Sequence, residues 1–310
     1  DISVLVPARD EAGNLALFME LAEAAFRSVP DVSFEVVVVD DGSEDETWTV
    51  LTGLSARYPF LRLARHRSGR GIADALRTGY LASRGRVLVF YPADLQFKPE
   101  DIPRLVAPIL ADEADMVTGF KQGEYDKAFV SGIYNRLSRS LFDVKVKDLN
   151  SVKAYRREIM DGLPVRPDWH RYMIVIAAAQ GFTVTEIPVA LYPRHSGKSK
   201  FASWRRIPIG VLDMLSVWFE LRFGQKPLLL FGMTGAALFA AGLLAGIGAL
   251  GWLLLTGQGV RAVWTVVQTC LILGGVFFAA GLVGEQVAAQ RAELREIRRR
   301  LEEMAARRRD

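Results

Sequence analysis

The sequence predicts an α/β domain with a mostly parallel sheet, followed by a pair of membrane-spanning helices. Apolar β-prone runs alternate with segments of helical periodicity through the first 120 residues, a pattern typical of a parallel sheet with helices on both faces. Two long stretches without charged residues follow residue 227. The 310-residue chain is 50% hydrophobic, which is too apolar for an ordinary soluble protein. The two stretches hold most of the excess of hydrophobic residues.

The first part of the chain supplies the strands and helices of the sheet domain. Strands are expected at 2–6, 34–39, 61–64, 88–91 and 115–118. Helices are expected at 13–28, from 44 onward, at 72–83 and at 99–110. Each strand therefore leads into a polar loop and a helix, which favours parallel neighbours.

The alternation weakens after Gly119. The sequence favours a helix at 130–142, a return strand or loop at 148–155, a turn at 164–170, a helix at 171–180 and a strand at 183–189. A loop rich in cations and hydroxyl groups follows at 192–201. We therefore assign residues 1–202 to one domain.

The remaining residues are organised around the membrane. Residues 203–226 combine Trp204 and Trp218 with several arginines, which favours an amphipathic helix in the membrane interface over an ordinary surface helix. Residues 227–285 hold two expected spans, about 228–256 and 264–284, each exceeding the ~20 residues that cross the hydrocarbon. Residues 286–310 form a charged tail helix, with a short coiled-coil contact as the alternative.

The distribution of basic residues predicts the orientation of these spans. The connection between them carries only Arg261, whereas lysines and arginines are concentrated before Leu228 and after Glu285. The positive-inside rule then places the sheet domain and the C-terminus in the cytoplasm, in an integral protein of the inner or plasma membrane. Because the basic excess lies beside apolar segments, a lipid bilayer is the expected partner and nucleic acid is not. The single cysteine, Cys270, excludes an internal disulfide.

Oxygen-bearing side chains follow two of the expected strands. Asp40 and Asp41 come directly after strand 34–39, and Asp94 and Gln96 follow strand 88–91. Open parallel sheets bind ligands at the carboxyl ends of their strands. Asp40 and Asp41 therefore suit a nucleotide base or ribose, and Asp94 and Gln96 suit Mg²⁺ or Mn²⁺ bridging to a diphosphate. The alternative for any single aspartate is a helix N-cap.

A glycine-rich loop with Gly71 adds to this pattern, and the motifs together resemble a known family. VPARDEAGN, VVVVDDGSEDET, GRGIADALRTGYLASRG, PADLQFKPEDIPRL and PRHSGKSKF are similar to the family 2 glycosyltransferases of GT-A fold. Among these they most resemble the polyprenyl-phosphate glycosyltransferases, the group that includes dolichol-phosphate mannose synthase. The resemblance covers nearly all of residues 2–202. It implies a Rossmann-like GT-A domain that moves one hexose, with inversion, from a nucleotide sugar to a polyprenyl phosphate.

The resemblance also implies roles for individual residues. It places Pro7, Arg9, Glu11 and Asp41 around the base and ribose, with Asp40 and Gly71 in the same nucleotide site. Asp94 and Gln96 hold the metal, and Asp148 aligns with an acidic position near the acceptor. We expect Asp148 and Asp94 to be the catalytic carboxylates, with the role of a turn acid before Asn150 as the alternative for Asp148. A UDP sugar is favoured as the donor, and GDP-mannose remains open.

The acceptor sets a further requirement. A phosphate monoester is largely a dianion at neutral pH and is already nucleophilic, so a general base is optional and positioning cations are required. The candidates are Lys121, Lys127, Arg136, Arg194, Lys198 and Lys200, with hydrogen bonds from Ser131 and Asn135. For His170, structural and functional roles carry equal weight.

The sequence departs from the family pattern at two positions. Pro92 stands where many members have a first acid, and Lys121 stands where an arginine is common. Either the metal completes its shell with diphosphate and water, which we prefer, or the metal site is weak. The rival functions are a membrane-anchored nucleotide-sugar-binding or regulatory protein, and a transferase for another lipid or a polysaccharide. Glycine-rich helices and the charged tail allow a homo-oligomer.

Overall fold

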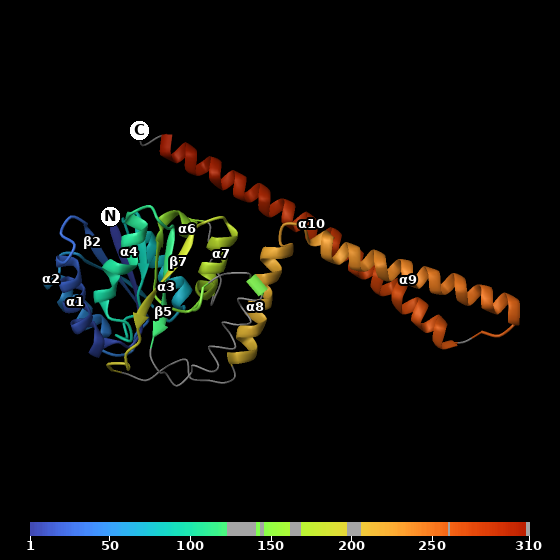
Figure 1. Cartoon of the computed structure of the whole chain (residues 1–310), viewed down its shortest axis with the longest axis horizontal. Coiled ribbons are helices and arrows are strands. Elements are labelled where there is room, and N and C mark those ends of the chain that lie inside the picture. The colour runs from blue at the N-terminus through green and yellow to red at the C-terminus, as the bar shows by residue number, and fades with distance from the viewer. Residues whose placement is uncertain (123–140, 143–145, 162–168, 197–205, 260, 308–310) are drawn as a thin grey trace. The chain divides into compact units, whose positions relative to one another are not determined.

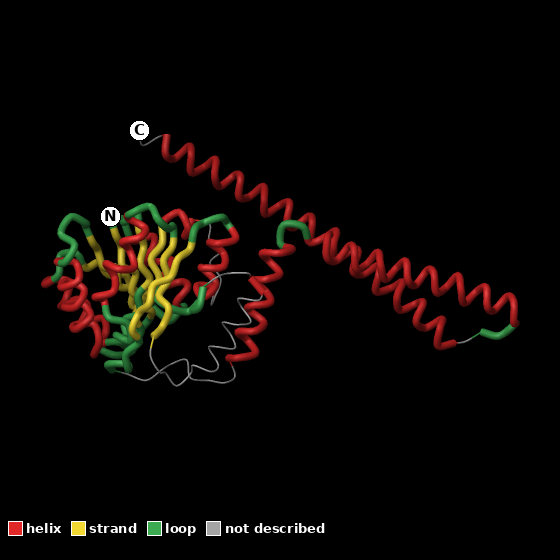
Figure 2. Tube along the Cα trace, in the orientation of Figure 1, coloured by secondary structure: helices red, strands yellow, loops and turns green. Residues whose placement is uncertain are grey.

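The chain folds into two compact units, Asp1–Met214 and Leu215–Asp310. The computed structural model describes all residues except 123–140, 143–145, 162–168, 197–205, 260 and 308–310. The strands belong to the first unit, whereas the second unit contains helices and short loops in its described residues (Figure 2). The boundary between the units falls within the segment 203–226 that the sequence predicts to lie at the membrane surface.

The first unit contains a seven-stranded sheet in the order β3-β2-β1-β4-β6-β5-β7. The strands are β1 (Ile2–Ala8), β2 (Phe34–Asp41), β3 (Leu61–His66), β4 (Val87–Phe90), β5 (Met116–Gln122), β6 (Lys153–Arg156) and β7 (Val184–Ala190). Every neighbouring pair is parallel except the two pairs that include β6. The predicted mostly parallel sheet is therefore confirmed.

Helices cover both faces of this sheet (Figure 1). They are α1 (Ala12–Arg27), α2 (Thr47–Arg57), α3 (Ile72–Ala82), α4 (Ile102–Leu110), α6 (Arg157–Asp161) and α7 (Met173–Ala179), with short 3₁₀ turns η1 (Pro99–Asp101) and η2 (Trp169–Tyr172). Helices α1, α2 and α4 pack into one hydrophobic core, and α3, α6 and α7 pack into the other. The helix expected at 130–142 lies almost entirely outside the described residues.

The central strands are buried on both faces, and this explains their continuous apolar sequence. In β1, Val4 faces the first core and Leu5 faces the second. In β4, Val89 and Leu88 are divided between the two cores in the same way. Side chains alternate along a strand, so a strand with helices on both sides needs apolar residues at every position.

The direction of β6 matters for the site. Its first residue, Lys153, pairs with Phe90 at the end of β4 and with Thr118 on β5. Because β6 runs antiparallel to both neighbours, its amino-terminal end lies at the carboxyl ends of β4 and β5. The segment that leads into β6 is thereby delivered to the edge of the sheet that carries the predicted ligand-binding residues.

The second unit contains two helices that are long and apolar enough to cross a membrane. Helix α8 (Arg206–Phe223) runs across the unit boundary and is followed by α9 (Pro227–Thr256) and α10 (Arg261–Arg307). The candidate spans are Pro227–Thr256, with a mean hydropathy of 2.1, and Arg261–Leu294, with a mean hydropathy of 2.2. Helix α10 is continuous through the predicted second span and the tail, so the tail begins without a break in the helix.

Helices α9 and α10 approach each other at their backbones. A Cβ added at Gly235 would lie 2.6 Å from the backbone nitrogen of Phe278, and one at Gly274 would lie 2.7 Å from that of Phe239. Small residues permit such close packing between helices in lipid. Glu285 of α10 also accepts a hydrogen bond (3.3 Å) from the backbone N–H of Leu228 in the first turn of α9.

We predict that Gly42→Ala destabilises the first unit. Gly42 has φ = +68°, and an added Cβ would lie 2.5 Å from the backbone carbon of Ser68 and 2.6 Å from the nitrogen of Gly69. Strained backbone of this kind costs about 1–3 kcal/mol, and the collision with neighbouring backbone adds to that cost. The melting temperature of the purified protein, measured by scanning fluorimetry, should therefore fall.

Gly53→Ala is the matched control. Gly53 lies in α2, and an added Cβ there would meet nothing within 4 Å. Replacing a helical glycine by alanine gains about 0.5–1 kcal/mol, so this variant should melt at or above the wild-type temperature. Equal melting of the Gly42 variant and wild type would contradict the close approach of the two loops.

Candidate active site

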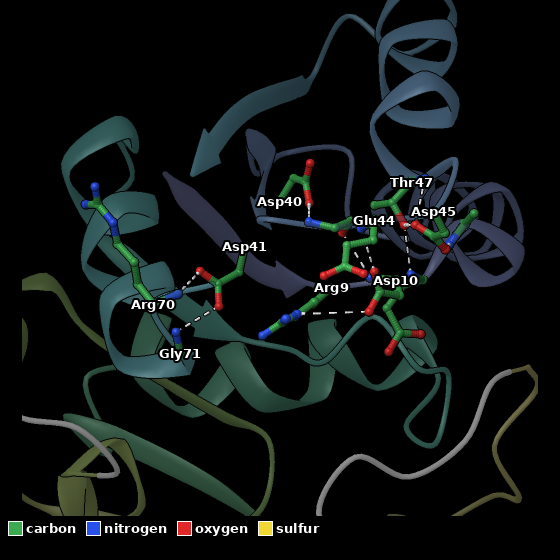
Figure 3. A network of polar contacts seen from close by, with 12 residues as sticks. Arg9, Asp10, Asp40, Asp41, Glu44, Asp45, Thr47, Arg70 and Gly71 are labelled. Carbon is green, nitrogen blue, oxygen red and sulfur yellow. Dashed lines mark hydrogen bonds and ion pairs between the residues drawn. The ribbon is translucent and has the colours of Figure 1, made fainter. Parts of the chain in front are cut away.

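Hydrogen bonds join the loop after β1 to the loop after β2 (Figure 3). The backbone N–H groups of Asp10 and Glu11 donate to Ser43 Oγ (2.9 Å) and Thr47 Oγ1 (2.8 Å). In return, the N–H of Glu44 donates to Asp10 Oδ1 (2.8 Å). The two segments predicted to bind the nucleotide therefore form one continuous surface.

Asp40 and Asp41 have different surroundings, although they are adjacent in sequence. Asp40 is fully buried, accepts a hydrogen bond from Ser43 N–H (2.9 Å) and forms an ion pair with Arg65 (3.0 Å). These are the contacts of a carboxylate that stabilises a turn, which is the alternative role for a single aspartate. The nucleotide-binding role of Asp40 stays a prediction.

Asp41 holds the glycine-rich loop in place. Its carboxylate accepts hydrogen bonds from the backbone N–H groups of Arg70 and Gly71, both at 2.8 Å (Figure 3). His66 Nδ1 lies 2.7 Å from Asp41 Oδ1, and His66 Nε2 lies 2.8 Å from Thr78 Oγ1. Burial alone would raise the pKa of Asp41, but the hydrogen bonds from Arg70, His66 and Gly71 outweigh burial and lower it.

Arg9 lies against the same loop. A Cβ added at Gly69 would meet the Arg9 guanidinium, so the loop passes directly beside this side chain. Pro7 pairs with Val39 within the sheet, two positions before Asp41. The structure thus gathers Pro7, Arg9, Asp41 and Gly71 at one end of the sheet, as the sequence predicts.

Arg194 connects three segments that are distant in the sequence. Its Nη2 lies 2.7 Å from Asp94 Oδ2, and its Nη1 lies 3.5 Å from Glu11 Oε1. Glu11 also accepts a hydrogen bond (2.5 Å) from Asn14 Nδ2. The loop after β7 is therefore bound to the loops after β1 and β4, through a residue predicted to contact the acceptor phosphate.

Asp94 is a buried carboxylate with a cation beside it. Its second oxygen accepts a hydrogen bond (3.2 Å) from the backbone N–H of Gln96. Burial raises the pKa of Asp94, and the charge of Arg194 opposes that rise. A carboxylate with a raised pKa gains from a neighbouring positive charge, and the chemistry of Asp94 therefore fits a divalent cation. No cluster of three or more His, Cys, Asp or Glu suited to a metal occurs in the described part of the chain. The metal role of Asp94 and Gln96 stays a prediction.

The predicted residues Asp148 and Lys121 form a second group at this edge of the sheet. Lys121 Nζ lies 3.2 Å from Asp148 Oδ2 and donates a hydrogen bond (2.8 Å) to the carbonyl oxygen of Asn150. The N–H of Asn150 donates to Asp148 Oδ1 (3.0 Å). Lys153 is fully buried below this turn and donates to the carbonyl oxygen of Leu149 (3.3 Å).

His170 lies in the buried region behind this group. Its ring packs edge-on against Phe90, with 6.4 Å between ring centroids. Burial, together with the charges of Lys153 and Arg171, lowers the pKa of His170 to about 3. A histidine that stays neutral at physiological pH is poorly suited to accept a proton in catalysis, and this favours a structural role for His170 over a catalytic one.

Several predicted residues cannot be placed, and others emerge only from the structure. Lys127, Ser131, Asn135, Arg136, Lys198 and Lys200 lie outside the described residues. Sequence reasoning missed His66 and Lys153. His66 lies two residues beyond the predicted strand 61–64, shortly before the glycine-rich loop, and Lys153 is a lone charge in the segment SVKAY. Both patterns were visible, but neither indicates which side chain is buried.

We predict that Asp41→Asn lowers the melting temperature at pH 7. The folded state depresses the pKa of Asp41 below its unfolded value of about 3.9, so this carboxylate contributes stability above pH ~4. That contribution is lost as the pH falls through the folded-state pKa. The gap in melting temperature between variant and wild type should therefore close below pH ~4 in a pH series. Asp31→Asn, at an exposed position, is the control and should show no such gap at any pH.

Three comparisons relate the chain to known proteins. Residues 3–161 match the family model described as Glycosyl transferase family 2. The dodecaprenyl-phosphate galacturonate synthase of Rhizobium johnstonii is 29% identical over 79% of this chain and 74% of its own length. An undecaprenyl-phosphate 4-deoxy-4-formamido-L-arabinose transferase of Pseudomonas fluorescens is 29% identical over 95% of this chain and 87% of its own. A dolichol-phosphate mannosyltransferase of Pyrococcus furiosus is 29% identical over 64% and 58%, respectively.

The solved structures agree with the fold. A glucosyl-3-phosphoglycerate synthase of Mycobacterium tuberculosis, in complex with Mn²⁺, UDP and glucosyl-3-phosphoglycerate, matches with a TM-score of 0.55. It is 20% identical and covers 69% of this chain and 80% of its own. At this identity the likeness shows the fold, and it confirms the predicted Rossmann-like GT-A domain. The matched family model and the relatives show that the chain belongs to glycosyl transferase family 2 and is a glycosyltransferase.

Proposed function

We propose that this glycosyltransferase moves a single hexose, with inversion, from a nucleotide sugar to a membrane polyprenyl phosphate. The position of Asp94 carries the proposal. Asp94 follows β4, and β4 lies between β1 and β6 in the sheet. The loop predicted to bind the nucleotide follows β1, and the Lys121–Asp148 group lies beside the start of β6. The polyprenyl-phosphate transferases among the relatives and the two helices able to cross a membrane support a lipid acceptor.

The residues suit an in-line displacement. An oxygen of the acceptor phosphate would attack the anomeric carbon as the bond from that carbon to the diphosphate oxygen breaks, giving a β-linked lipid phosphosugar and a nucleoside diphosphate. The dianionic acceptor needs no proton removed, so Lys121 would position it as a point charge and Asp148 would fix Lys121 in place. Mg²⁺ or Mn²⁺, held by Asp94 and Gln96, would offset the charge that develops on the diphosphate.

The donor is proposed to be a UDP sugar, with GDP-mannose as the alternative. Pro7, Arg9, Glu11, Asp41 and Gly71 would surround the base and ribose. Structural neighbours that carry UDP with Mn²⁺ or Mg²⁺ support this choice of nucleotide and metal. The mannosyltransferase relative keeps the alternative open.

The membrane arrangement is also a proposal. The basic residues before α9 and in the tail support a cytoplasmic catalytic domain and a cytoplasmic C-terminus, in an inner or plasma membrane. The acceptor phosphate would then meet the donor at the cytoplasmic surface. Close glycine contacts between α9 and α10 show that these helices pack tightly within one chain, and exposed apolar residues on α9 leave room for a homo-oligomer.

One observation favours a second function, a nucleotide-sugar-binding or regulatory protein without catalysis. Pro92 replaces the first acid of the family pattern, which leaves Asp94 with Arg194 as its charged partner in the described site. A radiolabelled nucleotide-sugar panel with polyprenyl phosphate separates the two functions. A mild-acid-labile lipid product supports our proposal. Binding without any product supports the second function, and product only with another lipid or a polysaccharide overturns the acceptor assignment.

We predict that Asp94→Asn lowers turnover with polyprenyl phosphate by about 100-fold or more, the usual effect of removing a group that stabilises developing charge. The melting temperature should not fall, because the change removes a buried charge whose pKa is raised by burial. Glu100→Gln, at an exposed position on η1, is the control and should keep wild-type turnover. Undiminished turnover in the Asp94 variant would exclude the metal assignment.

We also predict that Arg194→Gln strengthens Mn²⁺ binding in the absence of nucleotide. Arg194 lies 2.7 Å from Asp94 and competes with a metal for the same carboxylate. Removing that charge should lower the dissociation constant of Mn²⁺ at least about fivefold, equal to ~1 kcal/mol. Electron paramagnetic resonance of free Mn²⁺ measures the effect without any turnover.

The control for this experiment is Arg104→Gln, which removes an exposed guanidinium paired with Asp101. Its Mn²⁺ affinity should match that of the wild type. Unchanged or weaker Mn²⁺ binding in the Arg194 variant would show that Arg194 does not compete for Asp94.

A further inference from the structure

Lys153 is a charged residue in the interior of the sheet. It is the first residue of β6, none of its surface is exposed, and it stands between Phe90 of β4 and Thr118 of β5. Burying an ammonium group is costly unless it is paired and hydrogen-bonded. An apolar side chain would fill the same space between two strands at lower cost. The presence of lysine here therefore calls for a reason beyond packing.

The contacts of Lys153 point to the turn at residues 148–150. Its Nζ donates a hydrogen bond (3.3 Å) to the carbonyl oxygen of Leu149 and lies 5.6 Å from the centroid of the Phe90 ring. A cation over an aromatic face gains electrostatic energy when it is desolvated. The ammonium therefore contacts Phe90 at the end of β4 and the turn that immediately precedes β6.

Lys121 holds the same turn from another side. Its Nζ pairs with Asp148 (3.2 Å) and donates to the carbonyl oxygen of Asn150 (2.8 Å), and its side chain is 16% exposed. Two ammonium groups therefore bind consecutive carbonyls of one turn, one fully buried and one reaching the surface. Lys121 is therefore partly exposed, whereas Lys153 has no exposed surface.

We propose that Lys153 is a positioning residue for sugar transfer: its buried ammonium holds the 148–150 turn so that Asp148 and Lys121 face the acceptor phosphate. This inference rests on the proposed function, because Asp148 and Lys121 are the groups that would meet the acceptor. Lys153 acts through them and does not touch the substrate. Productive geometry in a transfer site depends on such support, since small displacements of a positioning group reduce the rate strongly.

The ionisation of Lys153 gives this role a measurable signature. Burial lowers the pKa of Lys153 from 10.5 to about 8; the charge of Asp148 opposes this shift, and that of Lys121 adds to it. Among the described residues, His170 of η2 is a further titratable group that faces it. As the pH rises through about 8, Lys153 loses its proton and its hold on the turn weakens. The turnover number should therefore decline above pH ~8.

The test uses the full-length protein in detergent, with a polyprenyl phosphate and the nucleotide sugar that the panel identifies. Lys153→Met removes the charge and keeps the length of the side chain. We expect kcat to fall about 30-fold, the donor KM to stay within twofold, and the decline near pH 8 to disappear. Lys153→Arg keeps a charge that does not titrate in this range, so it should recover most of kcat and extend activity above pH 9.

Tyr155→Phe is the matched control. Tyr155 lies two residues along β6, is fully buried like Lys153, and its hydroxyl has no hydrogen-bond partner among the described residues. Its kcat and pH profile should equal those of the wild type. A Lys153→Met variant with wild-type kcat and the same alkaline decline would overturn the proposal. Activity lost only together with a large drop in melting temperature would also overturn it.

Hydrogen exchange separates this inference from the proposed function. In Lys153→Met the backbone amides of residues 149–151 should exchange at least about tenfold faster, whereas Tyr155→Phe should leave them unchanged. This readout needs no substrate and does not depend on whether the arginine variant folds. Faster amide exchange at 149–151, in a protein that transfers sugar to no acceptor, would overturn the proposed function but would still support the role of Lys153 in holding the turn. Unchanged exchange at 149–151 would overturn the role of Lys153 itself.

Discussion

The antiparallel pairing of β6 with β4 and β5 is the constraint on which the site depends. In a wholly parallel sheet, the segment entering this central position would lie at the amino-terminal edge, far from the ligand. Reversal of one strand places the turn at 148–150 at the carboxyl edge, beside the residues that follow β4. The nucleotide-side loops and the Lys121–Asp148 group share one edge of the sheet for this reason.

The charged side chains at this edge form ion pairs with one another, and each partner could instead pair with a charged ligand. Arg194 joins Asp94 and Glu11, and Lys121 joins Asp148. Ligands of the proposed reaction carry the same kinds of charge, a divalent cation with phosphates. When a ligand binds, an ion pair between two side chains of this chain can be replaced by an ion pair between a side chain and the ligand, at small net electrostatic cost. Buried charges without any partner would instead carry a large desolvation penalty. Asp41 differs, since its hydrogen bonds hold the glycine-rich loop beside the proposed nucleotide site.

The fold was largely predictable because its signals are local. Strands buried on both faces read as continuous apolar runs, and the acids at the end of β2 and after β4 mark the strand ends directly in the sequence. The direction of β6 was not predictable, because a four-residue strand carries little pattern of its own and its pairing is non-local. The same holds for the Arg194–Asp94 contact, which joins loops 100 positions apart, and for the burial of Lys153 and His66.

The proline at position 92 affects how a metal ion could bind to Asp94. With proline at that position, a single guanidinium balances the buried carboxylate that follows β4. A metal ion that arrived alone would have to displace Arg194 from Asp94 and leave the guanidinium near the metal, with Glu11 as its remaining partner. A metal ion that arrives with a diphosphate brings the negative charge with which Arg194 can pair instead. Within the proposed mechanism, the metal and the donor should therefore bind together, and a second acid at position 92 would relax this coupling by attracting the free ion.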